Sequence, residues 1–225
     1  MERITVLLAD DHMIVREGIR ALLEAEGDIE VVGEAETGRQ AIQLVKRLRP
    51  AVVLMDIAMP LLNGLEATRR ILKAVPATRV LILSAHADDE YVRQAVMLGA
   101  AGYLIKETSA DLLSTAIREV QKGNTFFSPS IARRVQDLYP LSPDGRAGVK
   151  KGKTVLSSRE VEVLQLIAEG KANKQVAREL GISIKTVEKH RQHLMRKLDL
   201  HDTAGITRYA IAARIIESHV QVTII

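Results

Sequence analysis

Short apolar runs alternate with helix-like segments throughout the first half of the chain. Most of the runs are continuously apolar, which is typical of parallel strands covered on both faces. The segments between them, such as residues 13–27 and 90–100, repeat their apolar residues with a helical period. Five strand–helix units in succession predict an α/β fold with an open, doubly wound parallel sheet. The predicted strands lie at residues 4–9, 29–35, 51–56, 79–84 and 100–105.

The second half of the chain has a different pattern, because the alternation ends after about residue 122. The first domain is therefore expected to span residues 1–122. Residues 123–153 are rich in proline and glycine, which indicates a linker with one helical piece in its first half. Residues 154–218 have helical patterns throughout and predict an all-α domain of about four helices. Residues 219–225 remain as a short tail with no evident function.

Local signals define the helices of this second domain. Ser157 and Glu160 have the spacing of a capping box at the start of the first helix. Gly170 is expected to end this helix. The second helix covers "NKQVAREL", and the third, "IKTVEKHRQHLMRKL", has Ser183 as its expected N-cap. A fourth helix is expected to begin at Asp202.

The composition excludes several kinds of protein. The chain has no cysteine, so disulfides and thiolate metal sites are excluded. No apolar segment approaches the length of a membrane span, and the opening "MERITVLLADD" is too short and too acidic for a signal peptide. We therefore expect a cytoplasmic protein that makes no membrane contact.

Charge is distributed unevenly along the chain. The net charge of +4 combines −3 over residues 1–125 with +7 over the remaining residues. Only the second half suits a polyanionic partner such as nucleic acid. Charge alone leaves open whether this half binds nucleic acid or simply has a solvated basic surface.

Polar side chains follow four of the five predicted strands at the point where each strand ends. In an open parallel sheet these ends meet at one edge, where ligands bind. Each residue alone has a simpler interpretation as a helix cap, a turn residue or a surface lysine. Their coincidence at the correct strand ends instead predicts a functional site. The residues are Asp10, Asp11, Asp56, Ser84 and Lys106.

The chemistry of this set indicates phosphoryl transfer. Three carboxylates repel one another unless a cation neutralises them, and oxygen ligands of this kind suit Mg²⁺. With the cation in place, an anionic phosphoryl group can approach Asp56, and Lys106 can pair with the incoming charge. Asp56 is then the expected nucleophile. Tyr103, by itself, is most simply a core aromatic residue of the fifth strand.

The motifs "LLADDH", "VVLMDIAMPLLNGLEA", "VLILSAH" and "AAGYLIKE" resemble the receiver domain of bacterial two-component response regulators over residues 1–122. The resemblance implies a flavodoxin-like fold and a phosphoryl group transferred to Asp56 from a histidine kinase. It also implies a switch pair, Ser84 with Tyr103, and identifies Lys106 with the invariant lysine of the family. The implied ligands of Mg²⁺, or Mn²⁺, are Asp10, Asp11, Asp56 and the backbone carbonyl of Ala58.

The third helix of the basic half has two distinct faces. One face is apolar apart from Arg191, whereas the other is basic and carries an amide side chain. A short turn before such a helix is the layout of a helix-turn-helix, whose recognition helix fits the major groove of DNA. The pattern alone also fits an amphipathic helix of a helical bundle. The expected contacts to DNA bases and phosphates are Lys174, Lys185, Thr186, Glu188, Lys189, Arg191, Gln192 and Arg196.

Residues 154–218 resemble the LuxR-type DNA-binding domain of NarL/FixJ regulators, through "LSSRE", "NKQVA", "KTVE" and "KL" at the spacing of that family. By this analogy the last helix supplies a dimerisation face, although packing against the other helices explains its apolar residues equally well. These residues are Ile206, Tyr209, Ala213 and Ile216. His190 and His193 have no evident third ligand, so we interpret them as packing or phosphate-contacting residues.

The sequence therefore predicts a transcription regulator controlled by phosphorylation, with a histidine kinase and double-stranded DNA as partners and a homodimer on activation. Phosphorylation is expected to alter the surface of the fourth helix, fifth strand and fifth helix, which then either dimerises or stops covering the recognition helix. Such a protein catalyses at most its own phosphorylation and dephosphorylation.

Three other classes fit the pattern less well. A phosphatase of the haloacid dehalogenase type carries a second aspartate where this chain has Ala58, and a dehydrogenase needs G-x-G-x-x-G where it has "ADDHMI". A receiver that is never phosphorylated would not need the intact acidic set.

Overall fold

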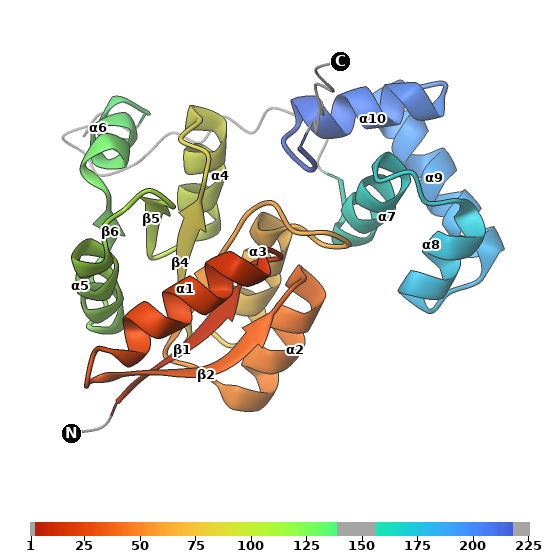
Figure 1. Cartoon of the computed structure of the whole chain (residues 1–225). Coiled ribbons are helices and arrows are strands. Elements are labelled where there is room, and N and C mark those ends of the chain that lie inside the picture. The colour runs from red at the N-terminus through yellow and green to blue at the C-terminus, as the bar shows by residue number, and fades with distance from the viewer. Residues whose placement is uncertain (1–2, 139–155, 218–225) are drawn as a thin grey trace, which may run out of the picture. The chain divides into compact units, whose positions relative to one another are not determined.

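The computed structural model describes residues 3–138 and 156–217. The chain divides into two compact units, Met1–Gly148 and Val149–Ile225 (Figure 1). Buried apolar residues occur in both, among them Leu7 in the first unit and Leu164 in the second. Each unit therefore has its own hydrophobic core.

A six-stranded parallel sheet with the order β2-β1-β3-β4-β5-β6 forms the centre of the first unit. The order reverses between β1 and β3, which places a switch point, and hence a crevice for ligands, at their carboxyl ends. This confirms the predicted α/β fold. The strands are β1 (Ile4–Ala9), β2 (Ile29–Ala35), β3 (Val52–Met55), β4 (Arg79–Ser84), β5 (Gly102–Ile105) and β6 (Phe126–Phe127).

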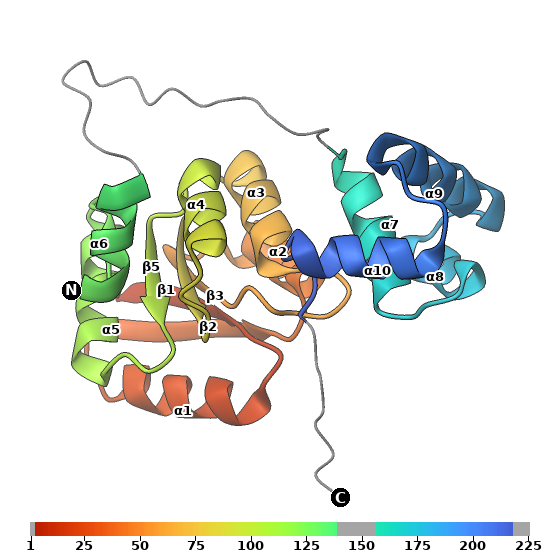
Figure 2. The ribbon, with the colours of Figure 1, turned by 90° about the horizontal axis from the view of Figure 1, so that it is seen from above.

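Helices cover both faces of this sheet, as the continuously apolar strands require (Figure 2). Alternate residues of one strand face opposite cores: Leu7 packs with α2, α3 and α4, and Leu8 packs with α1 and α5. The apolar face of each helix completes the core on its side. The helices are α1 (Met13–Glu24), α2 (Gly38–Leu48), α3 (Gly64–Ala74), α4 (Asp89–Leu98) and α5 (Ala110–Gln121).

Two elements lie in the described part of the range expected to be a linker, residues 123–138. The short strand β6 extends the sheet beside β5, with Phe127 opposite Tyr103. It leads into α6 (Pro129–Leu138), the expected helical piece, which packs against α4. Ile131 of α6 is completely buried in the core of the first unit. This part of the chain therefore belongs structurally to the sheet domain, and the sixth strand was not predicted.

Over residues 156–217 the second unit contains the four predicted helices. Helix α7 packs against α9 and α10, and α8 packs against α9. The capping box of Ser157 and Glu160 is present, and Ser183 caps α9 as expected. Gly181, with φ +62°, ends α8 and allows the tight turn into α9. The helices are α7 (Ser158–Ala168), α8 (Asn173–Leu180), α9 (Ile184–Leu198) and α10 (Thr203–Ala212).

Within residues 3–138 and 156–217, no helix is both long enough and apolar enough to cross a membrane. The expected tail at residues 219–225 and the second half of the expected linker lie outside the described residues.

Candidate functional site

Asp56 directly follows β3 and lies at the switch point of the sheet. Its backbone N–H donates to the Ala9 carbonyl oxygen over 2.8 Å, which continues the pairing of β3 with β1. Its side chain is buried, with Oδ1 accepting the N–H of Ile57 over 2.8 Å. A Cβ at Gly64 would overlap the Asp56 carbonyl oxygen, so only glycine lets the start of α3 approach this closely. The fold therefore fixes the carboxylate of Asp56 by its backbone.

Lys106 joins the two buried carboxylates of the site. Its Nζ lies 2.9 Å from Oδ2 of Asp56 and 2.7 Å from Oδ2 of Asp10. Asp11 is more exposed, and its carboxylate lies with those of Asp10 and Asp56 and the His12 ring in one cluster whose candidate ligand atoms are all within 4.8 Å of one another. The structure thus brings together the acidic residues that the sequence predicted.

The donor set of this cluster fits a hard divalent cation. Three carboxylate groups offer oxygen ligands at the carboxyl edge of the sheet, and Mg²⁺ prefers oxygen ligands. Ala58 lies two residues after Asp56, in the loop between β3 and α3. An acidic pocket suited to a cation is therefore present.

Burial and the charge of Lys106 act in opposite directions on the pKa of Asp56. Burial raises the pKa of this carboxyl to about 6, with Lys106 lowering it and Asp10 raising it. Burial lowers the pKa of the Lys106 ammonium, but Asp56 and Asp10 outweigh this and hold the pKa above its usual value. Lys106 therefore stays charged and only partly compensates the burial of Asp56.

Ser84 and Tyr103 both contact the loop that follows β4. The Ser84 hydroxyl accepts the backbone N–H of His86 over 3.1 Å, and the Tyr103 hydroxyl donates to the His86 carbonyl oxygen over 2.7 Å. Both side chains are completely buried, and burial raises the pKa of the Tyr103 phenol. Tyr103 also belongs to the hydrophobic core beside Ile131. The two expected switch residues therefore converge on one backbone segment.

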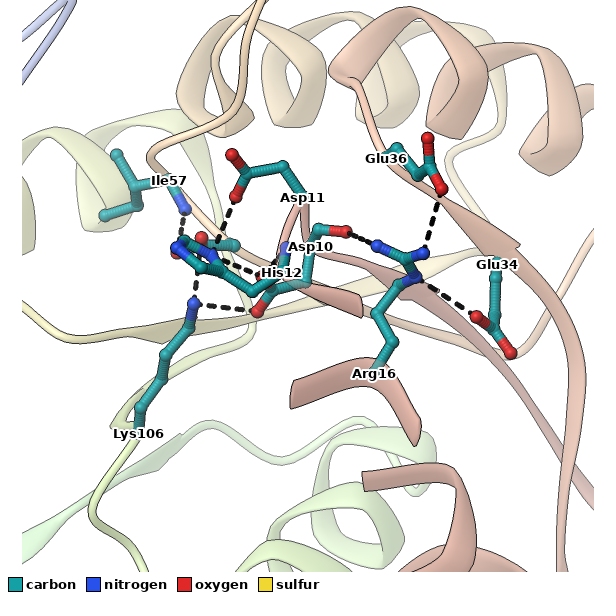
Figure 3. A network of polar contacts seen from close by, with 9 residues as sticks. Asp10, Asp11, His12, Arg16, Glu34, Glu36, Ile57 and Lys106 are labelled. Carbon is teal, nitrogen blue, oxygen red and sulfur yellow. Dashed lines mark hydrogen bonds and ion pairs between the residues drawn. The ribbon is translucent and has the colours of Figure 1, made fainter. Parts of the chain in front are cut away.

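Sequence reasoning missed two residues of the site, His12 and Arg16 (Figure 3). The His12 Nδ1 lies 3.1 Å from Oδ1 of Asp10 and 2.9 Å from Oδ1 of Asp11. Arg16 donates from Nη1 to the Asp10 carbonyl oxygen. His12 could have been found, because it directly follows the two aspartates, whereas Arg16 has the sequence context of an ordinary helical arginine.

The expected DNA contacts in the second unit are mostly solvent-exposed. Thr186 is half-buried and its hydroxyl lies 2.8 Å from that of Ser183. Val187 and Leu194 are buried on the inner face of α9, although Ile184 is 44% exposed. The exposed members of the expected set are Lys174, Lys185, Glu188, Lys189, Gln192 and Arg196.

Arg191 differs from the other expected contacts. It is half-buried, with Nη2 donating to the Thr203 hydroxyl over 2.5 Å and Nη1 lying 3.5 Å from Oδ1 of Asn173. Its side chain thus connects α9 to the starts of α8 and α10. This position explains why an arginine occurs on the otherwise apolar face.

The last helix has a packing role. Ile206 is completely buried, and α10 packs against α7. Tyr209 of α10 is half-buried, and so are Ala213 and Ile216, which follow the end of α10 at Ala212 and so do not belong to the helix, contrary to expectation. Packing within the unit therefore accounts for Ile206, and a dimerisation face on the other three residues remains a prediction.

Comparison with protein families matches both units. Residues 6–118 match the response regulator receiver domain, and residues 154–210 match the bacterial regulatory proteins of the luxR family. Among curated relatives, the transcriptional regulatory protein DegU of Brevibacillus brevis is 37% identical over 211 residues, which cover 89% of each chain. The oxygen regulatory protein NreC of Staphylococcus aureus is 38% identical over 214 residues, 94% of this chain and 99% of that protein.

Solved structures give the same result. The response regulator ChrA of a heme-sensing two-component system is 32% identical, with a TM-score of 0.52 over 96% of this chain and 100% of that chain. RcsB of Salmonella typhimurium is 29% identical, with a TM-score of 0.57 over 94% of this chain and 100% of that chain. Another structure shows RcsB bound to a promoter in the presence of the phosphomimetic BeF3−. It is 28% identical, with a TM-score of 0.57 over 92% of this chain and 98% of that chain.

A sheet domain with an acidic pocket, joined to a luxR-type helical domain, defines a regulator of transcription rather than a classical enzyme. The chain belongs to the NarL/FixJ family of two-component response regulators. This confirms the predicted family and the predicted class of function.

Proposed function

We propose that Asp56 accepts a phosphoryl group from the phosphohistidine of a histidine kinase, and that this controls transcription. One Asp56 carboxylate oxygen attacks phosphorus, the phosphorus–nitrogen bond breaks, and the kinase histidine leaves as a neutral imidazole once its nitrogen is protonated. The observation that carries the proposal is the buried Asp56 carboxylate held between Lys106 and the acidic cluster. In that position a nucleophile and its neutralising groups already lie together.

The residues around Asp56 have separate roles in this step. The Ile57 N–H orients Oδ1, and Lys106 neutralises charge on the phosphoryl oxygens as they arrive. Mg²⁺ or Mn²⁺ would be held by Asp10, Asp11, Asp56 and the Ala58 carbonyl, and would screen the carboxylates from the phosphoryl group. Water that attacks the same phosphorus later returns Asp56 to its free form, so the protein catalyses at most its own phosphorylation and dephosphorylation.

Ser84 and Tyr103 transmit the change. The Ser84 hydroxyl turns toward the phosphoryl oxygens and gives up its bond to the His86 N–H, while Tyr103 stays inward on the His86 carbonyl. The phosphoryl group stabilises one of two pre-existing conformations, so the population shift is limited to the difference in its contacts between them. The surface of α4, β5 and α5 then changes and controls dimerisation or release between the domains. β6 pairs with β5, and α6 packs on α4. A change in the surface of α4 and β5 therefore also alters the contacts of β6 and α6.

The recognition helix α9 enters the major groove in this proposal. Lys185, Lys189 and Gln192 read purine edges, and Glu188 accepts from a cytosine amino group. Lys174, Thr186 and Arg196 contact phosphates. A dimer places two such helices on half-sites about one helical turn apart. Arg191, with its partners inside the domain, supports the recognition surface from behind.

Intact mass and oligomeric state after addition of acetyl phosphate with Mg²⁺ test the proposal, with Asp56→Asn as the matched variant. We expect a phosphoryl adduct on the wild type only, together with a shift from monomer to dimer and tighter operator binding. Absence of an adduct from the wild type would overturn the proposed acceptor. An adduct that persists in Asp56→Asn would assign the phosphoryl group to another residue.

A further inference from the structure

Arg16 lies beside the acidic cluster, and its hydrogen bond to the cluster goes to the backbone of Asp10 (Figure 3). Its side chain is 6% exposed, although it projects from the second turn of α1. Nη1 donates to the Asp10 carbonyl oxygen over 2.7 Å, Nε to Oε2 of Glu34 over 3.1 Å, and Nη2 to Oε1 of Glu36 over 2.9 Å. The guanidinium thus holds three acceptors at once.

The Asp10 carbonyl is the first one beyond the paired part of β1. Ala9 is the last residue of β1 in register with β2 and β3, and its carbonyl oxygen accepts the Asp56 N–H over 2.8 Å. The Asp10 N–H still donates to the Ala35 carbonyl oxygen over 3.0 Å. Buried backbone carbonyls need a donor, and Arg16 supplies it where the sheet no longer does.

That carbonyl belongs to the peptide group joining Asp10 to Asp11. A peptide group is planar, so holding its oxygen restrains ψ of Asp10 and φ of Asp11, and with them the directions in which the two side chains leave the backbone. Arg16 is itself held by the carboxylates of Glu34, on β2, and of Glu36, in the turn that follows. Glu34 is also held by Arg20, whose Nη2 lies 2.6 Å from Oε1 of Glu34. The rigid fork of a guanidinium can serve three acceptors in fixed directions, which the flexible ammonium of a lysine cannot.

We infer that Arg16 is a positioning residue for divalent cation binding, acting through the Asp10–Asp11 peptide group. The inference rests on the proposed function of the acidic cluster as a cation site. Charge and geometry make opposite predictions here. A buried positive charge near the cluster repels a cation, so its removal should strengthen cation binding if charge alone matters. If Arg16 positions the carboxylates, its removal weakens cation binding.

Binding of Mn²⁺ to the full-length protein distinguishes these predictions, measured by calorimetry or by electron paramagnetic resonance of free Mn²⁺. We expect Arg16→Met to raise the Kd for Mn²⁺ by about tenfold, the scale found when outer-shell partners of metal ligands are removed. Arg16→Lys should also raise the Kd, because Glu34 and Glu36 attract the single ammonium away from the carbonyl. Arg20→Met is the matched control, since it removes an arginine from the same face of α1 and leaves the Asp10 contact intact. The Kd of the Arg20→Met protein should change less than about twofold, which is below the effect of removing a partner of a metal ligand.

Folding is checked by circular dichroism and by urea unfolding in the presence of a chelator. Weaker Mn²⁺ binding by a folded Arg16→Met protein, or by Arg16→Lys if the methionine variant does not fold, supports the inference. Unchanged or tighter binding by a folded Arg16→Met protein, or by Arg16→Lys where the methionine variant does not fold, overturns it and leaves the cation site intact. Failure of the wild type to bind Mn²⁺ would overturn the proposed function, and the inference with it.

Discussion

The Lys106 ammonium lies 2.9 Å from Oδ2 of Asp56, yet this contact does not fully compensate the burial of the carboxylate. Lys106 divides its charge between Asp56 and Asp10, which lies 2.7 Å from the same nitrogen. The pKa of Asp56 is therefore raised to about 6, mainly because the side chain is buried. The site thus holds a carboxylate whose ionised form costs stability until a cation arrives.

Asp56→Asn should consequently stabilise the receiver domain at neutral pH in the absence of divalent cations. The raised pKa means that the folded state binds a proton more readily than the unfolded state, whose pKa is near 3.8. The penalty is therefore fully present above pH 6 and disappears toward pH 4. We expect a gain on the order of 1–3 kcal/mol at pH 7.5, shrinking as the pH falls to about 4.5.

Urea unfolding with a chelator at both pH values measures this gain. Asp11→Asn is the control, because the Asp11 side chain is 33% exposed and should respond less. Added Mg²⁺ should stabilise the wild type and narrow its difference from Asp56→Asn. A variant that is less stable than the wild type at pH 7.5 would contradict the argument.

Docking of α6 on the sheet domain leads to a prediction about stability. Ile131 is completely buried in the same core as Tyr103, and the Ser128 N–H donates to the Tyr103 carbonyl oxygen over 3.1 Å. Ile131→Ala should therefore destabilise the receiver domain by about 2–4 kcal/mol through loss of burial and formation of a cavity. The loss of stability can be measured as faster hydrogen exchange at the backbone amides of β5.

Arg134→Ala provides the comparison for Ile131→Ala. Arg134 forms an exposed ion pair with Asp89 over 2.7 Å, and such pairs contribute less than about 1 kcal/mol. Equal effects of the two variants would mean that α6 is held by its surface charge rather than by its buried residue.

The part of the fold that could be predicted from the sequence depends on patterns that repeat along the chain. Continuously apolar strands alternate with amphipathic helices, and parallel topology then brings the ends of β1, β3 and β5 to one edge. This is why the sequence alone predicts that Asp10, Asp56 and Lys106 meet, and they do meet. Cap residues such as Ser157 act within one helical turn, so their role was equally accessible.

The features that could not be predicted depend on contacts between segments distant in sequence. β6 has only two residues, too few for a strand pattern, and its place follows from pairing with β5. Arg16 and Arg191 have the sequence context of surface arginines. Their roles follow from acceptors on other elements, such as the Asp10 carbonyl and the Thr203 hydroxyl.

Glu160 combines two stabilising contacts in the DNA-binding domain. Its carboxylate accepts the Ser157 N–H over 2.8 Å in the capping box and lies 2.7 Å from Nζ of Lys197 on α9. Burial raises the pKa of Glu160, but the contacts with Lys197 and Ser157 outweigh it and keep the pKa below its usual value. The contribution of this carboxylate is therefore present above its unfolded pKa and is lost as the pH falls through its folded pKa.

Glu160→Ala should accordingly lower the stability of this domain by about 1–3 kcal/mol at pH 7, since it removes the cap contact and leaves Lys197 without its carboxylate. Lys197→Met keeps the capping box and should cost less. Thermal unfolding at a series of pH values provides the measurement. The difference between Glu160→Ala and the wild type should decrease below about pH 4.5, and a difference independent of pH would show that the ion pair contributes nothing.

Arg191 and Arg196 lie on the same helix but should respond differently to substitution. Arg196 is exposed in the last turn of α9, whereas Arg191 is half-buried against Asn173 and Thr203. If Arg196 contacts a DNA phosphate as proposed, Arg196→Ala should reduce the salt dependence of binding by about one counterion without altering stability. Arg191→Ala should instead lower the melting temperature and weaken binding with little change in the salt slope. Operator titrations from 50 to 200 mM salt, about the range over which phosphate contacts dominate, measure both effects. If Arg191→Ala reduced the slope of log binding constant against log salt concentration by about one and left stability unchanged, this arginine would contact a phosphate instead.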